Sequence, residues 1–189
     1  MQAEDVLRSC VFELEKLKQR AEKALAQVRS EDLFRKLDAE SNSLAELMKH
    51  TSGILRARSM DFLNTDGEIG RNRDSEFVIE ATDTPESLTL RWQEGWRCLF
   101  ETLRELRPED LDRTVQIRSE PHSVIEAIHR TMTHCANHGG QIILLAKHFA
   151  GSRWQTLTIP RGKSKEFNAA MRQKRTTGYR SSQPSRPGA

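Results

Sequence analysis

The stretch PHSVIEAIHRTMTHCANHGGQIILLAKHF (residues 121–149) decides the fold predicted from this sequence. Its apolar residues recur at helical steps, which is typical of a helix with one buried face. The inward-facing members of the pattern are Val124, Ile128, Cys135, Ile142, Leu145 and Phe149. We predict a helix that begins at Pro121, because proline suits the first helical position, and runs to about Phe149.

Three further segments show the same period. We predict a first helix over residues 3–28 and a second over 39–63, with Ser43 or Ser41 as its N-cap. A third helix begins at Pro85, capped by Thr84, and ends before Pro108. Its apolar stripe consists of Trp92, Trp96, Leu99, Leu103 and Leu106. Four long amphipathic helices predict an all-α four-helix bundle, and the long link between the second and third argues against simple up-down-up-down wiring.

Outside these four helices, the sequence predicts a long loop, two short extended segments and a short helix. Residues 64–87 are polar and turn-rich, which indicates a long loop. Residues 113–118 and 154–160 alternate apolar and polar side chains, so we expect two short extended segments that could pair as a small hairpin. Residues 163–173 could form a last short helix.

Charge is distributed unevenly along the 189 residues. From Lys147 onward there are ten Lys or Arg and one acidic residue, a net +9, whereas the first 146 residues hold 20 basic and 26 acidic residues, a net −6. We predict a helical domain over residues 1–170 and a basic, disordered tail over 171–189, since the tail cannot build a core. Nucleic-acid binding by this tail is the less favoured alternative.

Targeting and redox features are few. The longest aliphatic run, IILLA (142–146), is far shorter than the roughly 20 residues of a membrane span, so we expect no membrane association. The N-terminus lacks the pattern of a secretory signal. Cys10, Cys98 and Cys135 are odd in number and widely separated, which favours a reduced, cytoplasmic setting.

Three of the six histidines lie within residues 132–148. His134 and His138 are four apart, so they differ by only about 40° around a helix and roughly 6 Å along it, and both imidazoles could reach one metal ion. Gln141 lies on nearly the same face and could orient a ligand through a hydrogen bond. His148 lies about 21 Å from His134 along the axis, too far to share the ion. Ordinary helix histidines remain the alternative at this point.

Two neighbouring features bear on this pair. Gly139 and Gly140 are unfavourable inside a helix, which suggests that another group approaches there closely. His50 lies at the edge of the apolar stripe of the second predicted helix, between Leu47 and Ile54. It could be a third ligand or a half-buried histidine bonded to the backbone.

A family resemblance favours the metal site. LMKHTSGIL in the second helix and THCANHGGQI in the last resemble the DinB superfamily of YfiT-like metal-dependent hydrolases. The segments RARSMDFLNTDGEIGRNRDSEF, VQIRSEPHSVIEAI and WQTLTIPRGKSKEFN resemble one subfamily of unknown function. The resemblance implies a four-helix bundle with a crossover, a homodimer, and His50, His134 and His138 as ligands of a divalent ion. It also places Gln141 at the family's glutamine, and Cys135, which departs from the motif, is expected in the core.

Three neutral imidazoles with open positions suit zinc or nickel. Characterised members of the superfamily include transferases that use low-molecular-weight thiols, so the resemblance implies such a transferase or a hydrolase acting on a small molecule. The alternative is a non-catalytic, metal-binding dimeric bundle acting in stress response. No catalytic residue can be assigned.

Other charged residues near the predicted site admit two interpretations. Glu46 and Glu126 could act as bases, although solvated charges are the favoured interpretation. The loop residues Arg71, Arg73 and Asp74 could hold an anionic substrate, or could simply be solvated.

Overall fold

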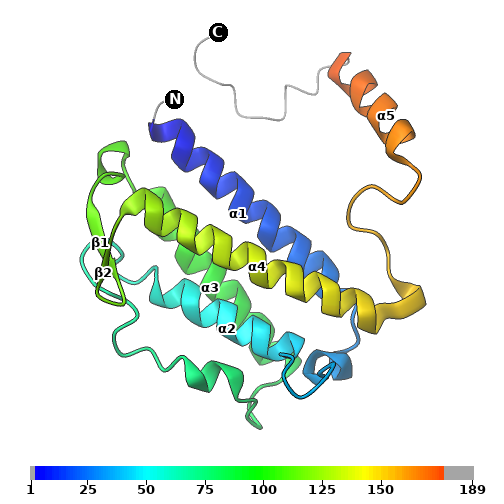
Figure 1. Ribbon diagram of the computed structural model, residues 1–189, viewed down its shortest axis with the longest axis horizontal. Helices are drawn as coiled ribbons and strands as arrows, with labels where there is room; N and C mark the ends of the chain where they lie inside the picture. The colour runs from blue at the N-terminus through cyan, green and yellow to red at the C-terminus, as the bar shows by residue number, and fades with distance from the viewer. Residues whose placement is uncertain (1–2, 177–189) are drawn as a thin grey trace. The chain divides into compact units, whose positions relative to one another are not determined.

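The computed structural model describes residues 3–176, and the chain divides into two units after Trp154. The first unit is a bundle of four long helices (Figure 1). These are α1 (Ala3–Leu25), α2 (Leu44–Ala57), α3 (Pro85–Glu105) and α4 (Val124–Ala150). Short 3-10 turns lie at η1 (Ser30–Phe34), η2 (Asp74–Phe77), η3 (Pro108–Asp110) and η4 (Gly151–Arg153). The predicted all-α bundle is therefore confirmed.

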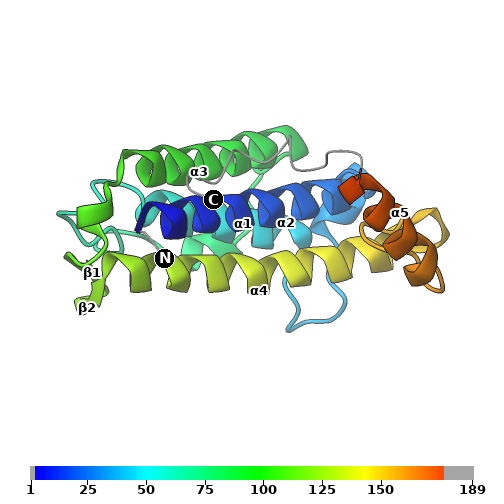
Figure 2. The ribbon, with the colours of Figure 1, turned by 90° about the horizontal axis from the view of Figure 1, so that it is seen from above.

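The order of contacts along the helices gives the wiring. Ser52 of α2 lies against Gly95 of α3, and the Thr102 hydroxyl of α3 donates to the carbonyl of Ser59 just after α2. Rising numbers in one helix therefore match rising numbers in the other, so α2 and α3 run parallel. A parallel pair needs a crossover, which residues 58–84 supply. Figure 2 shows the four helices side by side with their long axes aligned.

The apolar stripes meet in the interior of this bundle. The third stripe is buried as predicted, with Trp96 2% exposed, and Leu14, Leu44 and Leu88 are fully covered. In α4 the inward pattern is also confirmed, except that Phe149 is only half-buried. Each helix packs mainly on one neighbour, α2 on α3 and α1 on α4, while α2 also contacts α4.

The helix starts follow local hydrogen bonding. Ser43, Thr84 and Ser123 each accept from the backbone N–H three residues later, and the side chain at that position bonds back to the cap. The caps at Ser43 and Thr84 were predicted. The prediction that α4 begins at Pro121 is wrong, because Pro121 lies in a strand and the capping box of Ser123 starts the helix at Val124.

Two other boundaries differ from the prediction. The second helix is shorter than 39–63: Asp38 holds a turn by accepting from Glu40 and Ser41 before it, and Asp61 has a positive φ of 44° after it. Strand β1 (Thr114–Ile117) is confirmed, but it pairs with β2 (Glu120–Ser123) and not with 154–160, which is no strand. Positive φ angles at Arg118 and Ser119 (56° and 62°) close a tight antiparallel hairpin between neighbouring segments.

The second unit contains one described helix, α5 (Ser164–Thr176). It confirms the short helix predicted over 163–173, beginning one residue later and ending three residues later. The tail predicted beyond Thr176 lies outside the described residues.

Gly95 allows the close approach of α3 to α2. A Cβ at this position would lie 2.9 Å from the Cα and 3.0 Å from the carbonyl oxygen of Ser52, and backbone cannot move aside cheaply. We expect Gly95→Ala to lower the free energy of unfolding by about 1–3 kcal/mol, despite alanine's better helix propensity. Gly140→Ala, where a Cβ would meet nothing within 4 Å, should instead be neutral or stabilising. Urea titrations of both variants test this, and equal effects would contradict it.

Candidate metal centre

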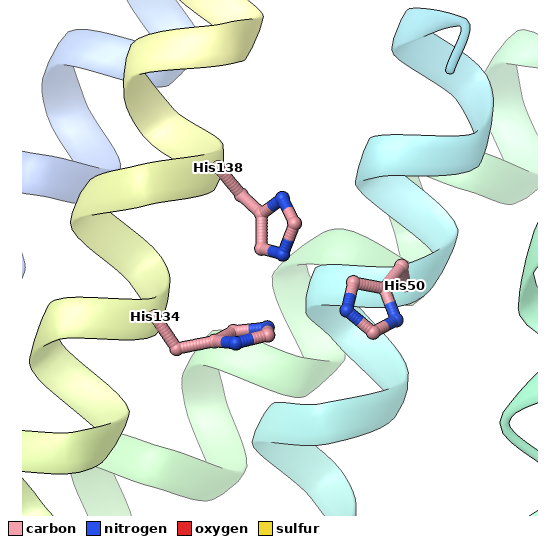
Figure 3. A group of neighbouring side chains, drawn as sticks. All are labelled: His50, His134 and His138. Carbon is pink, nitrogen blue, oxygen red and sulfur yellow. The ribbon is translucent and has the colours of Figure 1, made fainter. Parts of the chain in front are cut away.

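Three histidine side chains converge between α2 and α4 (Figure 3). His50 comes from α2, and His134 and His138 come from α4. One ring nitrogen from each residue lies within 4.8 Å of the others, and the ring centroids are 4.4–5.1 Å apart. The structure thus brings together the three residues that the sequence singled out.

The antiparallel contact of α2 with α4 creates this convergence. His134 and His138 share one face of α4, as their spacing predicts, and that face is turned toward α2. His50 is only 3% exposed, whereas His134 and His138 are half-buried, so the cluster has a closed side on α2 and an accessible side on α4. The exposed part of the cluster therefore belongs to the two α4 histidines, although the Nε2 of His134 is buried.

The hydrogen bonds of the rings leave nitrogens available for a metal ion. His50 Nδ1 lies 2.8 Å from Glu76 Oε2, and His138 Nδ1 lies 2.7 Å from Gln141 Oε1. With each Nδ1 donating to an oxygen, each Nε2 keeps a free lone pair. His134 Nε2 is buried and has no hydrogen-bond partner within the described part of the chain. A buried nitrogen without a partner is costly, so the cluster fits a metal ion as its missing partner.

Electrostatics keep the α4 histidines neutral, the form that binds metals. Burial, followed by the neighbouring charges of His138 and His50, lowers the pKa of His134 to about 3. Burial also lowers the pKa of His138, against an opposing effect of its hydrogen bond to Gln141. Protons therefore compete weakly with a metal ion for these two rings at neutral pH.

Glu76 is a site residue that the sequence interpretation missed. It lies in η2, within the long loop, 26 positions after His50, and is 7% exposed. Burial alone would raise its pKa, but hydrogen bonds from His50 and Arg71 outweigh burial and hold the pKa below its ordinary value. No helical or strand period includes Glu76, so the pattern of the sequence could not mark it as buried.

The two carboxylates considered as bases lie in capping boxes. Glu46 is 3% exposed, bonds to Ser43 and pairs with Lys36, so describing it as a solvated charge is wrong. Glu126 is exposed and bonds to Ser123 at the start of α4. Neither belongs to the histidine cluster.

Of the expectations for other residues of α4, two are confirmed and one is wrong. Cys135 is buried in the core as expected, and burial raises the pKa of its thiol to about 12, which disfavours a ligand role. His148 is exposed and outside the cluster, as expected. The close approach expected at Gly139 and Gly140 is wrong, because a Cβ at either position would meet nothing within 4 Å.

The two loop arginines differ in burial and in their ion pairs. Arg71 is buried against Glu68 and Glu76, so it is not solvated. Arg73 is half-exposed; its guanidinium carbon lies 4.9 Å from the ring centroid of Phe77, whose ring lies 4.6 Å from that of His50. Asp74, its neighbour, is almost fully exposed. Arg73 therefore keeps a guanidinium close to the cluster and open to solvent.

Comparison with models of known protein families gives a match. A family model described as "Protein of unknown function (DUF1572)" matches residues 1–163, which include the whole histidine cluster. The search of curated proteins finds no match. Among the described residues, no helix is long and apolar enough to cross a membrane.

Proposed function

The chain belongs to the DUF1572 family, a DinB-like family, and we propose that it is a metal-dependent enzyme acting on a small molecule. The ion is divalent, zinc or nickel, and its ligands are His50, His134 and His138. The reaction is that of a low-molecular-weight thiol S-transferase, in which the sulfur of the thiol displaces a leaving group and becomes bonded to the substrate, or it is hydrolysis. The observation that carries the proposal is the convergence of three imidazoles, one of which has a buried nitrogen without a partner.

The number of ligands favours a reactive site over a structural one. Structural zinc sites are closed by four protein ligands, whereas catalytic sites use three and leave a position for water or substrate. Within the described residues the cluster holds three. A divalent ion bound there would lower the pKa of a coordinated water or thiol and polarise a substrate.

The surrounding residues suggest how a substrate would be held. His134 and His138 provide the accessible side of the cluster. Arg73 lies over Phe77 near that cluster, and its guanidinium suits a carboxylate or phosphate on the substrate. A small molecule carrying a negative charge is therefore the substrate class that this surface favours.

Metal analysis of protein purified without a histidine tag tests the site. We expect about one divalent ion per chain in the wild type and a loss of that ion in His134→Ala, because two imidazoles bind more weakly than three. His148→Ala is the matched control, since it removes an exposed histidine from the same helix. Equal metal content in wild type and His134→Ala would contradict the proposal.

Activity is tested on the metal-loaded protein with thiol cosubstrates and with hydrolysable esters. We expect turnover that is lost in His134→Ala and kept in His148→Ala. Metal binding without turnover in either assay would favour a non-catalytic metal-binding bundle instead.

A further inference from the structure

The buried carboxylate of Glu76 is held in a fixed orientation from two sides. Arg71 grips it with two hydrogen bonds, Nε to Oε1 at 2.8 Å and Nη2 to Oε2 at 2.7 Å. The same Oε2 accepts from His50 Nδ1 at 2.8 Å. A bidentate arginine fixes the plane of a carboxylate as well as its position, so Oε2 is aimed at the imidazole.

Helix α2 leaves room for this carboxylate at Gly53, three residues after His50. A Cβ on Gly53 would lie only 2.0 Å from Glu76 Oε1 and 2.5 Å from its carboxyl carbon. Any larger residue here would displace a carboxylate that Arg71 holds in place. One turn of α2 therefore supplies both the imidazole and the space for its partner.

The contacts of Arg71 continue to the other helix of the site. Arg71 Nη1 donates to both carboxylate oxygens of Glu68, at 2.9 and 2.8 Å. Glu68 also pairs with Arg58 at 3.4 Å, and Arg58 in turn lies 3.4 Å from the hydroxyl of Thr131. Thr131 is on α4, one turn before His134. A chain of alternating charges thus spans from the ligand on α2 to the helix that carries the other two.

We propose that Glu76 is the positioning residue of the metal centre. It accepts the Nδ1 proton of His50 and so turns Nε2 toward His134 and His138, while Arg71 and Gly53 keep Glu76 in place. The long loop between α2 and α3 is therefore part of the metal site and not only a connection. This inference rests on the proposed function, because it assigns a role toward the same metal ion.

The physical reason is the tautomer of a neutral imidazole. An ionised carboxylate can only accept, so its neighbour Nδ1 must carry the proton, and the lone pair then belongs to Nε2. A carboxylate in this place also raises the basicity of the ligand nitrogen. Without Glu76, His50 could protonate either nitrogen and rotate, and the three-ligand geometry would form less often.

The test compares Glu76→Gln with Glu46→Gln by zinc titration against a chelator of known affinity. Both variants neutralise a buried glutamate, Glu76 in the loop that packs against α2 and Glu46 in the first turn of α2. Among the described residues, Glu46 bonds to the cap residue Ser43 and to Lys36 and not to the histidines. We expect Glu76→Gln to weaken zinc binding by about 10–100-fold, the usual effect of losing such a partner. Glu46→Gln should stay within about threefold. Equal affinities of wild type and Glu76→Gln would overturn the inference.

A second readout needs no metal. In ¹⁵N-histidine spectra of the metal-free protein, His50 should carry its proton on Nδ1 in the wild type and lose this preference in Glu76→Leu, which has no oxygen to accept that proton. An unchanged tautomer overturns the inference. If wild type and His134→Ala bind zinc equally weakly, the proposed function fails, while this tautomer still decides the role of Glu76.

Gly53→Ala keeps the test decisive if Glu76→Gln does not fold. It deletes no polar group, and alanine is the better helix former, so the helix itself should not suffer. We expect weaker zinc binding and a disturbed His50 tautomer, because the new methyl group occupies the place of Glu76 Oε1. Wild-type zinc affinity in a folded Gly53→Ala variant would overturn the inference.

Discussion

Asp83→Asn is expected to lower the free energy of unfolding at pH 7 by about 3–5 kcal/mol, because it leaves a buried lysine without its counter-ion. Lys49 Nζ lies 2.7 Å from Asp83 Oδ2, and the two side chains are 9% and 0% exposed. Lys49 also donates to the carbonyl of Val78. The pair therefore ties the end of the long loop to the residue next to His50.

Arg91→Ala is the control for this prediction. Arg91 pairs with the other oxygen of Asp83, but its side chain is 41% exposed. An exposed partner contributes about 1 kcal/mol or less. Urea unfolding of the three proteins measures both effects. An Asp83→Asn effect as small as that of Arg91→Ala would show that Lys49 finds another partner.

The effect of Asp83→Asn should depend on pH. Burial alone would raise the pKa of Asp83, but hydrogen bonds from Lys49 and the backbone of Glu80 outweigh it and hold the pKa below its ordinary value. A lowered folded-state pKa contributes stability that is present above the ordinary aspartate pKa of about 4 and is lost as the pH falls further. The difference between wild type and variant should thus be largest near neutrality and shrink below about pH 4.

The helices of this chain could be predicted because each buries one stripe. The stripe of α3, with Trp92 and Trp96, and its Pro85 start are visible in local sequence alone. The ends of α2 are not, because apolar spacing continues past the point where Asp61 takes a positive φ. The predicted hairpin partner of β1 was wrong, because the alternation of apolar and polar residues marks a strand but does not identify the segment that pairs with it.

A residue of the candidate site could be predicted from the sequence only where a short-range pattern in the chain marks it. The spacing of His134 and His138 follows from helix geometry, whereas His50 required the family resemblance. Glu76 and Glu46 were missed as buried carboxylates because their partners come from tertiary structure and from a cap. The reaction and the homodimer rest on the resemblance and stay predictions.

The thermal stability of the metal-free protein should show how much the unpaired nitrogen of His134 destabilises the fold. His134 Nε2 is buried without a partner among the described residues, and such a group costs about 1–3 kcal/mol. Replacing it with an apolar residue of similar size removes this cost. In the presence of a chelator we therefore expect His134→Leu to unfold at a higher temperature than the wild type.

Zinc should reverse that order. At free zinc about 1,000 times its dissociation constant, binding to the folded state alone adds about 4.1 kcal/mol, or roughly 8–16 °C for a chain of this size. His134→Leu lacks a ligand and should gain little, so the wild type becomes the more stable protein. Thermal unfolding of both, with chelator and with zinc, measures the reversal, and His148→Leu should follow the wild type in each condition. A His134→Leu variant that is less stable than the wild type even with chelator would show that this histidine contributes to packing, whereas a reversal is the behaviour of a residue kept for binding at the expense of stability.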